Sequence, residues 1–128
     1  MSATFPSDWP KPCPPESATP AAGRIYRRTK KSPPSDKDLQ THHQKGTGEG
    51  KFSPCGRCGL SVLTDEADLE HSFRLFDYQG FYVFRADVGP EHGKMMPAGG
   101  PIQSHTNVWF HEDVDVGSLF SFDREMRK

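Results

Sequence analysis

The chain contains no apolar run near 18 residues and no positively charged start followed by a hydrophobic stretch. A membrane-spanning helix needs about 20 predominantly apolar residues, and a secretion signal needs a hydrophobic core of its own. The sequence therefore predicts neither a membrane span nor a secretion signal. We expect a cytoplasmic protein that has no membrane partner.

Apolar residues are scarce, at 33% of the 128 residues, and eight of the twelve prolines lie in the first 34 positions. Average globular chains are about 45 to 50% apolar when glycine is counted. A segment rich in Pro, Ser, Ala and Thr buries too little apolar surface to offset the entropy lost on ordering. We therefore predict a disordered Pro-rich tail over 1–23, a small domain over 24–122 and a charged C-terminal tail over 123–128.

Neither sign of charge dominates, because the net charge is -1, but the charges are unevenly distributed. Residues 1–54 carry nine basic and five acidic residues, whereas residues 55–128 carry seven basic and twelve acidic ones. The basic cluster between Arg24 and Lys31 has the composition of a nucleic-acid-binding patch, but a solvated face is the commoner explanation of a bare charge run. We do not expect direct binding of nucleic acid.

Cysteines are few and odd in number, which favours a reducing compartment over a framework of disulfides. Cys55 and Cys58 form a CxxC pair whose glycines let the backbone turn, as in half of a zinc knuckle. His71 follows after twelve intervening residues, and a fourth ligand would have to come from elsewhere in the chain. Ordinary turn cysteines, a redox pair and a zinc-stabilised interaction module all stay open; our main hypothesis includes no metal or other cofactor.

The pattern of apolar residues predicts an α+β fold, a small single domain with a mixed or antiparallel sheet and two short helices. Alternation makes 81–88 the strongest predicted strand, and strands are also predicted at 23–28, 59–63, 106–111 and 118–122. One helix is predicted over 36–43. The other begins at Thr64 or Asp65 and places Leu69, Phe73 and Phe76 on one face.

No complete catalytic signature is present. The best local group of Ser, His and acid consists of Ser104-His105 and His111-Glu112, but their spacing does not enforce a triad. A hydrolase is therefore only a minor alternative.

A different enzymatic reading starts from the strand that carries Arg27, continues to the strand with Ser61 and then to the strand 81–88. This order resembles the small bacterial ADP-ribosyltransferase-like and RES-type toxins. The resemblance implies an enzyme that holds NAD with a first-strand arginine, a serine and an acidic residue, here Arg27, Ser61 and Glu112. The alternative is that neither residue is functional: Arg27 is then a surface charge, and Ser61 is an ordinary strand residue.

The segment 71–78 concentrates large apolar side chains, and its spacing is typical of a core helix. Leu75, however, falls outside the stripe that one helix face can bury. Ser72-Phe73-Arg74-Leu75-Phe76 resembles the peptides that dock on the bacterial DNA sliding clamp, whose usual form is Gln-Leu-Ser/Asp-Leu-Phe, with Ser72 in place of the glutamine. A second, poorer match ends in Leu119 and Phe120.

Together with the small size and labile composition, this motif makes the chain resemble bacterial toxins of the SocB type. That resemblance implies a non-enzymatic inhibitor of DNA replication that occupies the groove of the sliding clamp and excludes polymerase and repair proteins. It further implies an antitoxin that acts as an adaptor and delivers the toxin to an AAA+ protease. We take this as the main functional hypothesis, with Ser72, Phe73, Leu75 and Phe76 as the binding residues.

Overall fold

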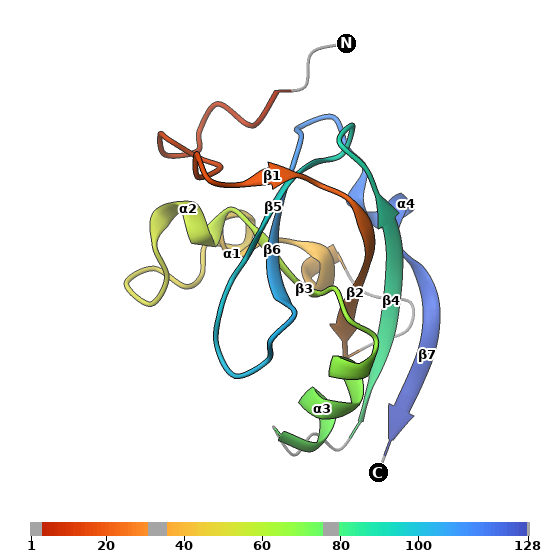
Figure 1. The fold of residues 1–128 in the computed structure, drawn as a ribbon. Helices are drawn as coiled ribbons and strands as arrows, with labels where there is room; N and C mark the ends of the chain where they lie inside the picture. The colour runs from red at the N-terminus through yellow and green to blue at the C-terminus, as the bar shows by residue number, and fades with distance from the viewer. Residues whose placement is uncertain (1–3, 31–35, 76–79, 128) are drawn as a thin grey trace.

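A computed structural model describes residues 4–30, 36–75 and 80–127, which form one seven-stranded antiparallel sheet with short helices around it (Figure 1). The strands lie in the order β1-β5-β6-β3-β2-β4-β7. Their bounds are β1 Thr19–Pro20, β2 Gly23–Thr29, β3 Leu60–Leu63, β4 Gly80–Val88, β5 Gly93–Pro97, β6 His105–Phe110 and β7 Ser121–Arg127. The helices are the 3-10 turn η1 Asp36–Leu39, α1 His42–Lys45, α2 Pro54–Arg57, α3 Ala67–Leu75 and α4 Val116–Leu119.

Strands β2 and β4 form the longest strand pair of the sheet. They pair over seven positions, from Gly23 opposite Val88 to Thr29 opposite Tyr82. Side chains on a strand alternate between the two faces, so Ile25 on β2 and Ala86 on β4 enter the same core. The strands predicted at 23–28, 59–63, 81–88 and 106–111 are thereby confirmed within a residue or two at each end.

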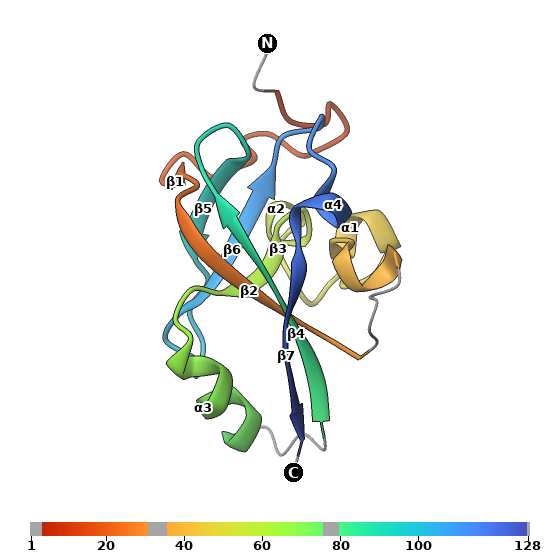
Figure 2. The same cartoon turned by 90° about the vertical axis from the view of Figure 1, so that its right-hand side faces the viewer.

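Helix α3 covers the other face of the sheet at the end where β4 begins, as Figures 1 and 2 show. Leu69 and Phe73 are buried against the sheet, and the ring centroids of Phe73 and Phe81 lie 5.2 Å apart in an edge-to-face contact. The predicted apolar face of this helix is confirmed for these two positions. Phe76, its third predicted member, lies outside the described residues.

The sheet consists of two parts that meet at a narrow seam. Strands β1, β5, β6 and β3 form one part, and β2, β4 and β7 form the other. In the described residues β2 and β3 share a single register pair, Tyr26 opposite Leu63, whereas β3 and β6 share four. The sheet is therefore least tightly joined where β2 leaves β3.

The C-terminal segment predicted as a tail, 123–128, is instead strand through Arg127 and pairs with β4 from Gly80 onward. Its charges alternate on an edge strand, where they stay solvated or form ion pairs, such as the 3.0 Å contact between Arg85 and Asp123. The strand predicted at 118–122 is also shifted. Asp115 caps α4 by accepting from the backbone N–H of Ser118, and β7 begins only after this helix.

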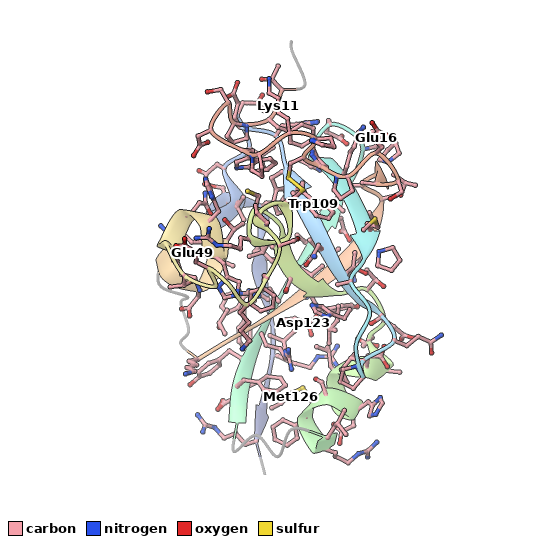
Figure 3. The ribbon with its side chains drawn as sticks, turned by 90° about the vertical axis from the view of Figure 1, so that its left-hand side faces the viewer. Lys11, Glu16, Glu49, Trp109, Asp123 and Met126 are labelled. Atoms are coloured by element: carbon pink, nitrogen blue, oxygen red, sulfur yellow. A yellow bond between two sulfur atoms is a disulfide. The ribbon has the colours of Figure 1, made fainter. Side chains whose placement is uncertain are left out.

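The N-terminal Pro-rich segment is attached to the domain, so the domain extends further than the predicted boundary at residue 23. Thr19–Pro20 pairs with β5, and Cys13 forms a disulfide with Cys55 of α2, with Cα atoms 5.4 Å apart. Figure 3 shows this bond beside Trp109, which is 1% exposed. The sequence favoured a reducing compartment over a framework of disulfides, whereas the fold brings together two cysteines that are 42 residues apart and joins them in one bond.

The predicted fold class is confirmed: the chain forms a small single α+β domain with an antiparallel sheet. The described residues include four short α-helices where two were expected. The predicted helix over 36–43 is divided into η1 and α1, because Thr41 adopts an extended conformation and caps α1 together with Gln44. This division matters for the site, since both short elements face the seam between β2 and β3.

Candidate functional site

A cleft of about 460 Å³ opens at the seam between β2 and β3. Residues from β2, β3, β6, η1, α1 and the start of β4 line it. Its described lining includes four basic side chains and one acidic one, namely Arg27, Arg28, Lys30, Lys45 and Asp38. The cleft therefore has the electrostatic character of a site for an anion.

Arg27 lies at the centre of this arrangement. Its Nε donates to the backbone carbonyl of Asp38 at 3.1 Å, and its Nη1 donates to the backbone carbonyl of Ser61 at 2.8 Å. The second bond crosses the seam just where the pairing of β2 with β3 has ended. The guanidinium thus connects β2 and β3 at a point where no backbone register pair joins them.

The charge of Arg27 is only partly compensated. Burial lowers the pKa of its guanidinium, the charge of Arg28 lowers it further, and the charge of Asp38 opposes this. Among the described residues Arg27 forms no ion pair within 4.0 Å. Its two described hydrogen-bond acceptors are neutral carbonyls. A negatively charged ligand in the cleft would therefore stabilise this side chain.

Ser61 and His105 form a hydrogen-bonded pair on the wall of the cleft. The Oγ of Ser61 lies 3.1 Å from Nε2 of His105, and Nδ1 of His105 lies 3.2 Å from the backbone carbonyl of Gly99. A carbonyl oxygen can only accept, so Nδ1 carries the hydrogen in the neutral ring and Nε2 is the acceptor. The hydroxyl of Ser61 also has a longer alternative acceptor, Oδ1 of Asn107 at 3.4 Å.

The strand register explains how these residues meet. Ser61 on β3 stands opposite Asn107 on β6, and His105 is two residues from Asn107 on the same face. Side chains that are diagonal neighbours on one face are within reach of each other when one of them is as long as histidine. The pair is therefore held by two hydrogen-bonded strands rather than by loops.

The remaining wall of the cleft is apolar and aromatic. Tyr26, Leu63 and Phe81 line it and belong to the core beneath α3. The guanidinium carbon of Arg28 lies 5.8 Å from the centre of the Phe81 ring, which is within the range of a cation–π contact. A flat ring could occupy this side of the cleft while its charged groups face Arg27.

Of the three residues that the resemblance to NAD-using toxins implies, two line this cleft. Arg27 donates to the backbone carbonyl of Ser61, but Glu112 is not in this cleft. Its side chain is exposed and accepts a hydrogen bond from Oγ1 of Thr4 at 2.5 Å. The three residues are therefore not brought together in this cleft, because Glu112 follows the end of β6 that points away from the seam.

The predicted clamp-binding motif is divided by α3. Ser72 is fully buried with its hydroxyl bonded to the carbonyl of Leu69, and Phe73 is 7% exposed, whereas Leu75 is 49% exposed. Helical spacing causes this division, because it turns positions 69, 72 and 73 toward the sheet and 75 away from it. Phe76 lies outside the described residues.

The second, poorer match to a clamp-binding peptide lies in and after α4. Leu119 is partly buried against the core, and Phe120 is 7% exposed within it. As the structure stands, neither side chain is presented to a partner.

The predicted zinc ligands are not brought together. Cys55 is bonded to Cys13 and offers no thiolate, while His71 lies on the exposed side of α3 beside Asp68. Cys58 is 1% exposed, and burial raises the pKa of its thiol to about 11. No group of three or more His, Cys, Asp or Glu side chains suited to a metal occurs within the ranges that the structure describes.

Sequence reasoning missed His105 as the partner of Ser61. It paired His105 with its neighbour Ser104, whose hydroxyl instead accepts from the backbone N–H of Asp65 at the start of α3. His111 and Glu112 bond to other residues, since Nδ1 of His111 is bonded to the carbonyl of Glu91 and Glu112 accepts from Thr4. Only the pairing of β3 with β6 could have identified the true neighbours.

A second cleft, of about 370 Å³, lies beneath the N-terminal segment and is lined by Trp9, His111 and Glu112 among others. There Asp8 and Nε2 of His43 lie 2.8 Å apart, and the hydrogen bond from His43 lowers the pKa of Asp8. This contact joins the segment to α1. It adds to the disulfide as a second attachment.

The chain matches no model of a known protein family, no curated protein and no solved structure. In the described ranges, no helix has both the length and the apolar character needed to cross a membrane. The functional argument therefore depends on the cleft itself.

Proposed function

We propose that the chain binds a phosphate-bearing nucleotide, such as NAD, in the cleft between β2 and β3. The observation that carries this proposal is the guanidinium of Arg27, which is charged, partly buried, open to the cleft and without an ion pair among the described residues. A phosphate in the cleft would supply the missing negative charge. Lys45 on α1 and Lys30 after β2 add to the attraction.

The size and the walls of the cleft support a nucleotide over a bare anion. A volume of about 460 Å³ lies within the range of about 300 to 1,000 Å³ that is usual for small-molecule sites. The apolar side of the cleft, lined by Tyr26, Leu63 and Phe81, can contact the apolar part of a nucleotide while its phosphate faces Arg27. The proposal assigns no role to Glu112 and concerns binding alone.

Calorimetric titration of the purified chain with NAD, ADP and inorganic phosphate tests this proposal. Arg27→Met removes the charge but keeps much of the side-chain volume, and we expect it to weaken nucleotide binding about 10- to 100-fold, as for the loss of a charge-assisted hydrogen bond. Arg24→Met is the matched control on the same strand, because Arg24 is exposed and paired with Asp87 at 2.8 Å.

Arg27 also joins the two strands, so the folding of each variant has to be compared by circular dichroism. Arg27→Lys keeps the charge but has a single donor group to divide between the two carbonyls. If both Arg27 variants remain folded and bind nucleotide as tightly as the wild type, or if the wild type binds none of the three ligands, the proposal is wrong.

A second candidate function is the one that the clamp motif predicts: a toxin-like inhibitor that binds the sliding clamp in the cytoplasm and is removed through an antitoxin and an AAA+ protease. The observation in its favour is Leu75, which is 49% exposed at the end of α3. Binding through the whole motif would require Phe73 to leave the core. The cytoplasm also keeps thiols reduced, so this function would be exercised without the disulfide.

Leu75→Ala and Phe122→Ala form a matched pair for this second candidate, since Phe122 on β7 is 50% exposed. Burying a leucine in an apolar groove contributes about 1.5 to 3 kcal/mol, so Leu75→Ala should weaken clamp binding about 10- to 100-fold. Phe122→Ala should leave it unchanged. The measurement is a clamp pull-down under reducing conditions. Equal effects of the two substitutions would show nonspecific hydrophobic binding and would refute the motif.

A further inference from the structure

We propose that Ser61 is a nucleophile activated by His105, and that the cleft hydrolyses an acyl ester carrying an anionic group. The anionic part of this substrate class rests on the proposed function of the cleft, whereas the reactivity of Ser61 does not. The proposal begins from the bond of 3.1 Å between the Oγ of Ser61 and Nε2 of His105.

The pair has the three parts that an activated nucleophile requires. The hydroxyl and the base lie within hydrogen-bond reach, and a third group orients the base. In this chain the third group is the carbonyl of Gly99, which holds Nδ1 of His105 at 3.2 Å and leaves Nε2 free to accept a proton from Ser61. Gly99 has a φ of +77°, a left-handed conformation that suits glycine, in the turn between β5 and β6.

Both the geometry of the pair and its position in the cleft suit catalysis. Ser61 and His105 are both partly exposed and both line the cleft, so a substrate bound there can reach the hydroxyl. The two residues project from paired strands, which hold reacting groups more firmly than loops do.

The charges around Ser61 favour the attack of its hydroxyl on a carbonyl group. The guanidinium of Arg27 is bonded to the backbone carbonyl of the same serine at 2.8 Å, and Lys45 lines the same cleft. A cationic group of the cleft that reaches the acyl oxygen of a bound ester would stabilise the oxyanion that develops there. The same charges attract an ester whose acyl part ends in a carboxylate or a phosphate.

In the first step the Oγ of Ser61 bonds to the acyl carbon, and its proton passes to Nε2 of His105. The ester bond to the leaving alcohol then breaks, and the alcohol takes this proton from Nε2. Water attacks the acyl-serine in the second step and gives a proton to Nε2. The bond to Oγ breaks, the proton returns to Ser61, and the acid is released.

A fluorophosphonate probe tests the nucleophile without any knowledge of the natural substrate. Reaction forms a bond between phosphorus and the Oγ of Ser61 and breaks the phosphorus–fluorine bond; fluoride leaves while the serine proton passes to His105. We expect a single adduct on the folded wild type, located at Ser61 by peptide mass spectrometry. Ser61→Ala should abolish it, and His105→Asn should slow labelling about 100-fold or more.

Ser104→Ala is the matched control, because Ser104 is the sequence neighbour of His105 but is bonded at the start of α3. It should be labelled as fast as the wild type, provided that circular dichroism shows all variants folded. The nucleophile is refuted if the wild type is labelled no faster in its folded state than in urea, or if the adduct persists in Ser61→Ala.

Two chromogenic esters test the substrate class: 4-nitrophenyl acetate, which is neutral, and mono-4-nitrophenyl succinate, which is anionic. We expect a preference for the succinate ester of about 10-fold or more in kcat/KM and the loss of this preference in Arg27→Met. The absence of any preference overturns the anionic substrate class. If Ser61 is labelled but no nucleotide binds, the proposed nucleotide-binding function is refuted and the nucleophile stands. If a nucleotide binds but Ser61 is not labelled, the nucleophile is refuted and the nucleotide-binding function stands.

Discussion

Breaking the disulfide between Cys13 and Cys55 should lower the free energy of unfolding by about 4 kcal/mol. The estimate follows from the 42-residue separation of the two cysteines, because a cross-link restricts the unfolded chain by an entropy that grows with the logarithm of the loop length. Domains of this size are usually stable by only about 5 to 15 kcal/mol, so the loss is a large fraction of the total. Cys13→Ser is the variant of choice, since Cys13 lies outside the strands.

Urea denaturation followed by tryptophan fluorescence measures this loss. Trp109 is buried beside Cys58, and Trp9 stacks on Phe5, so unfolding changes the surroundings of both indoles. With a slope of about 1 to 3 kcal/mol per molar urea, the midpoint should fall by about 1.3 to 4 M. The reduced wild type should unfold at the same urea concentration as Cys13→Ser, and reductant should not affect the variant. Equal midpoints for oxidised and reduced wild type would refute the reasoning.

Four further predictions concern the packing of the domain. Phe73→Ala should destabilise the fold by about 3 to 5 kcal/mol because Phe73 is buried, whereas Leu75→Ala should change stability by less than about 0.5 kcal/mol because Leu75 is exposed. Comparing the urea midpoints of the two variants tests the orientation of α3. The Cys58 thiol, with its pKa raised by burial to about 11 against an ordinary value of 9.0, should react with a disulfide reagent at pH 8 far more slowly in the folded protein than in urea. The raised pKa of Cys58 stabilises the folded state while the thiol is protonated. This contribution to the free energy of unfolding should be present below pH 9 and disappear as the pH rises toward 11. Urea unfolding measured across that pH range tests it. Gly93→Ala should prevent β5 from pairing with β6, because its Cβ would lie 2.0 Å from the carbonyl oxygen of Trp109, and a thermal melt close to that of the wild type would contradict this contact.

The parts of the fold that the sequence could predict are those with strong periodicity. Strand β4 alternates apolar and polar side chains from Phe84 to Val88, and Leu69 and Phe73 follow helical spacing in α3. The N-terminal and C-terminal parts carry no such signal. Edge strand β7 is rich in charge because one of its edges faces solvent, and β5 combines glycine, lysine and proline with two methionines.

The candidate site could be predicted only in part, for a related reason. Arg27 and Ser61 were both named from the sequence as candidates, and the fold brings them together because β2 and β3 are adjacent strands. His105 could not be identified in the same way, since its contact with Ser61 depends on the register of β3 against β6. The bond between Cys13 and Cys55 could not be predicted, because no local pattern connects two cysteines that are 42 residues apart.

The single register pair between β2 and β3 has a consequence for the dynamics of the sheet. Backbone amides on both sides of this seam should exchange their hydrogens with solvent more readily than those in the middle of β2 and β4. A molecule that touches both walls of the cleft would join the two parts of the sheet and slow this exchange. Amide protection in Leu60–Leu63 can thus report occupancy of the cleft before the chemistry of its ligand is known.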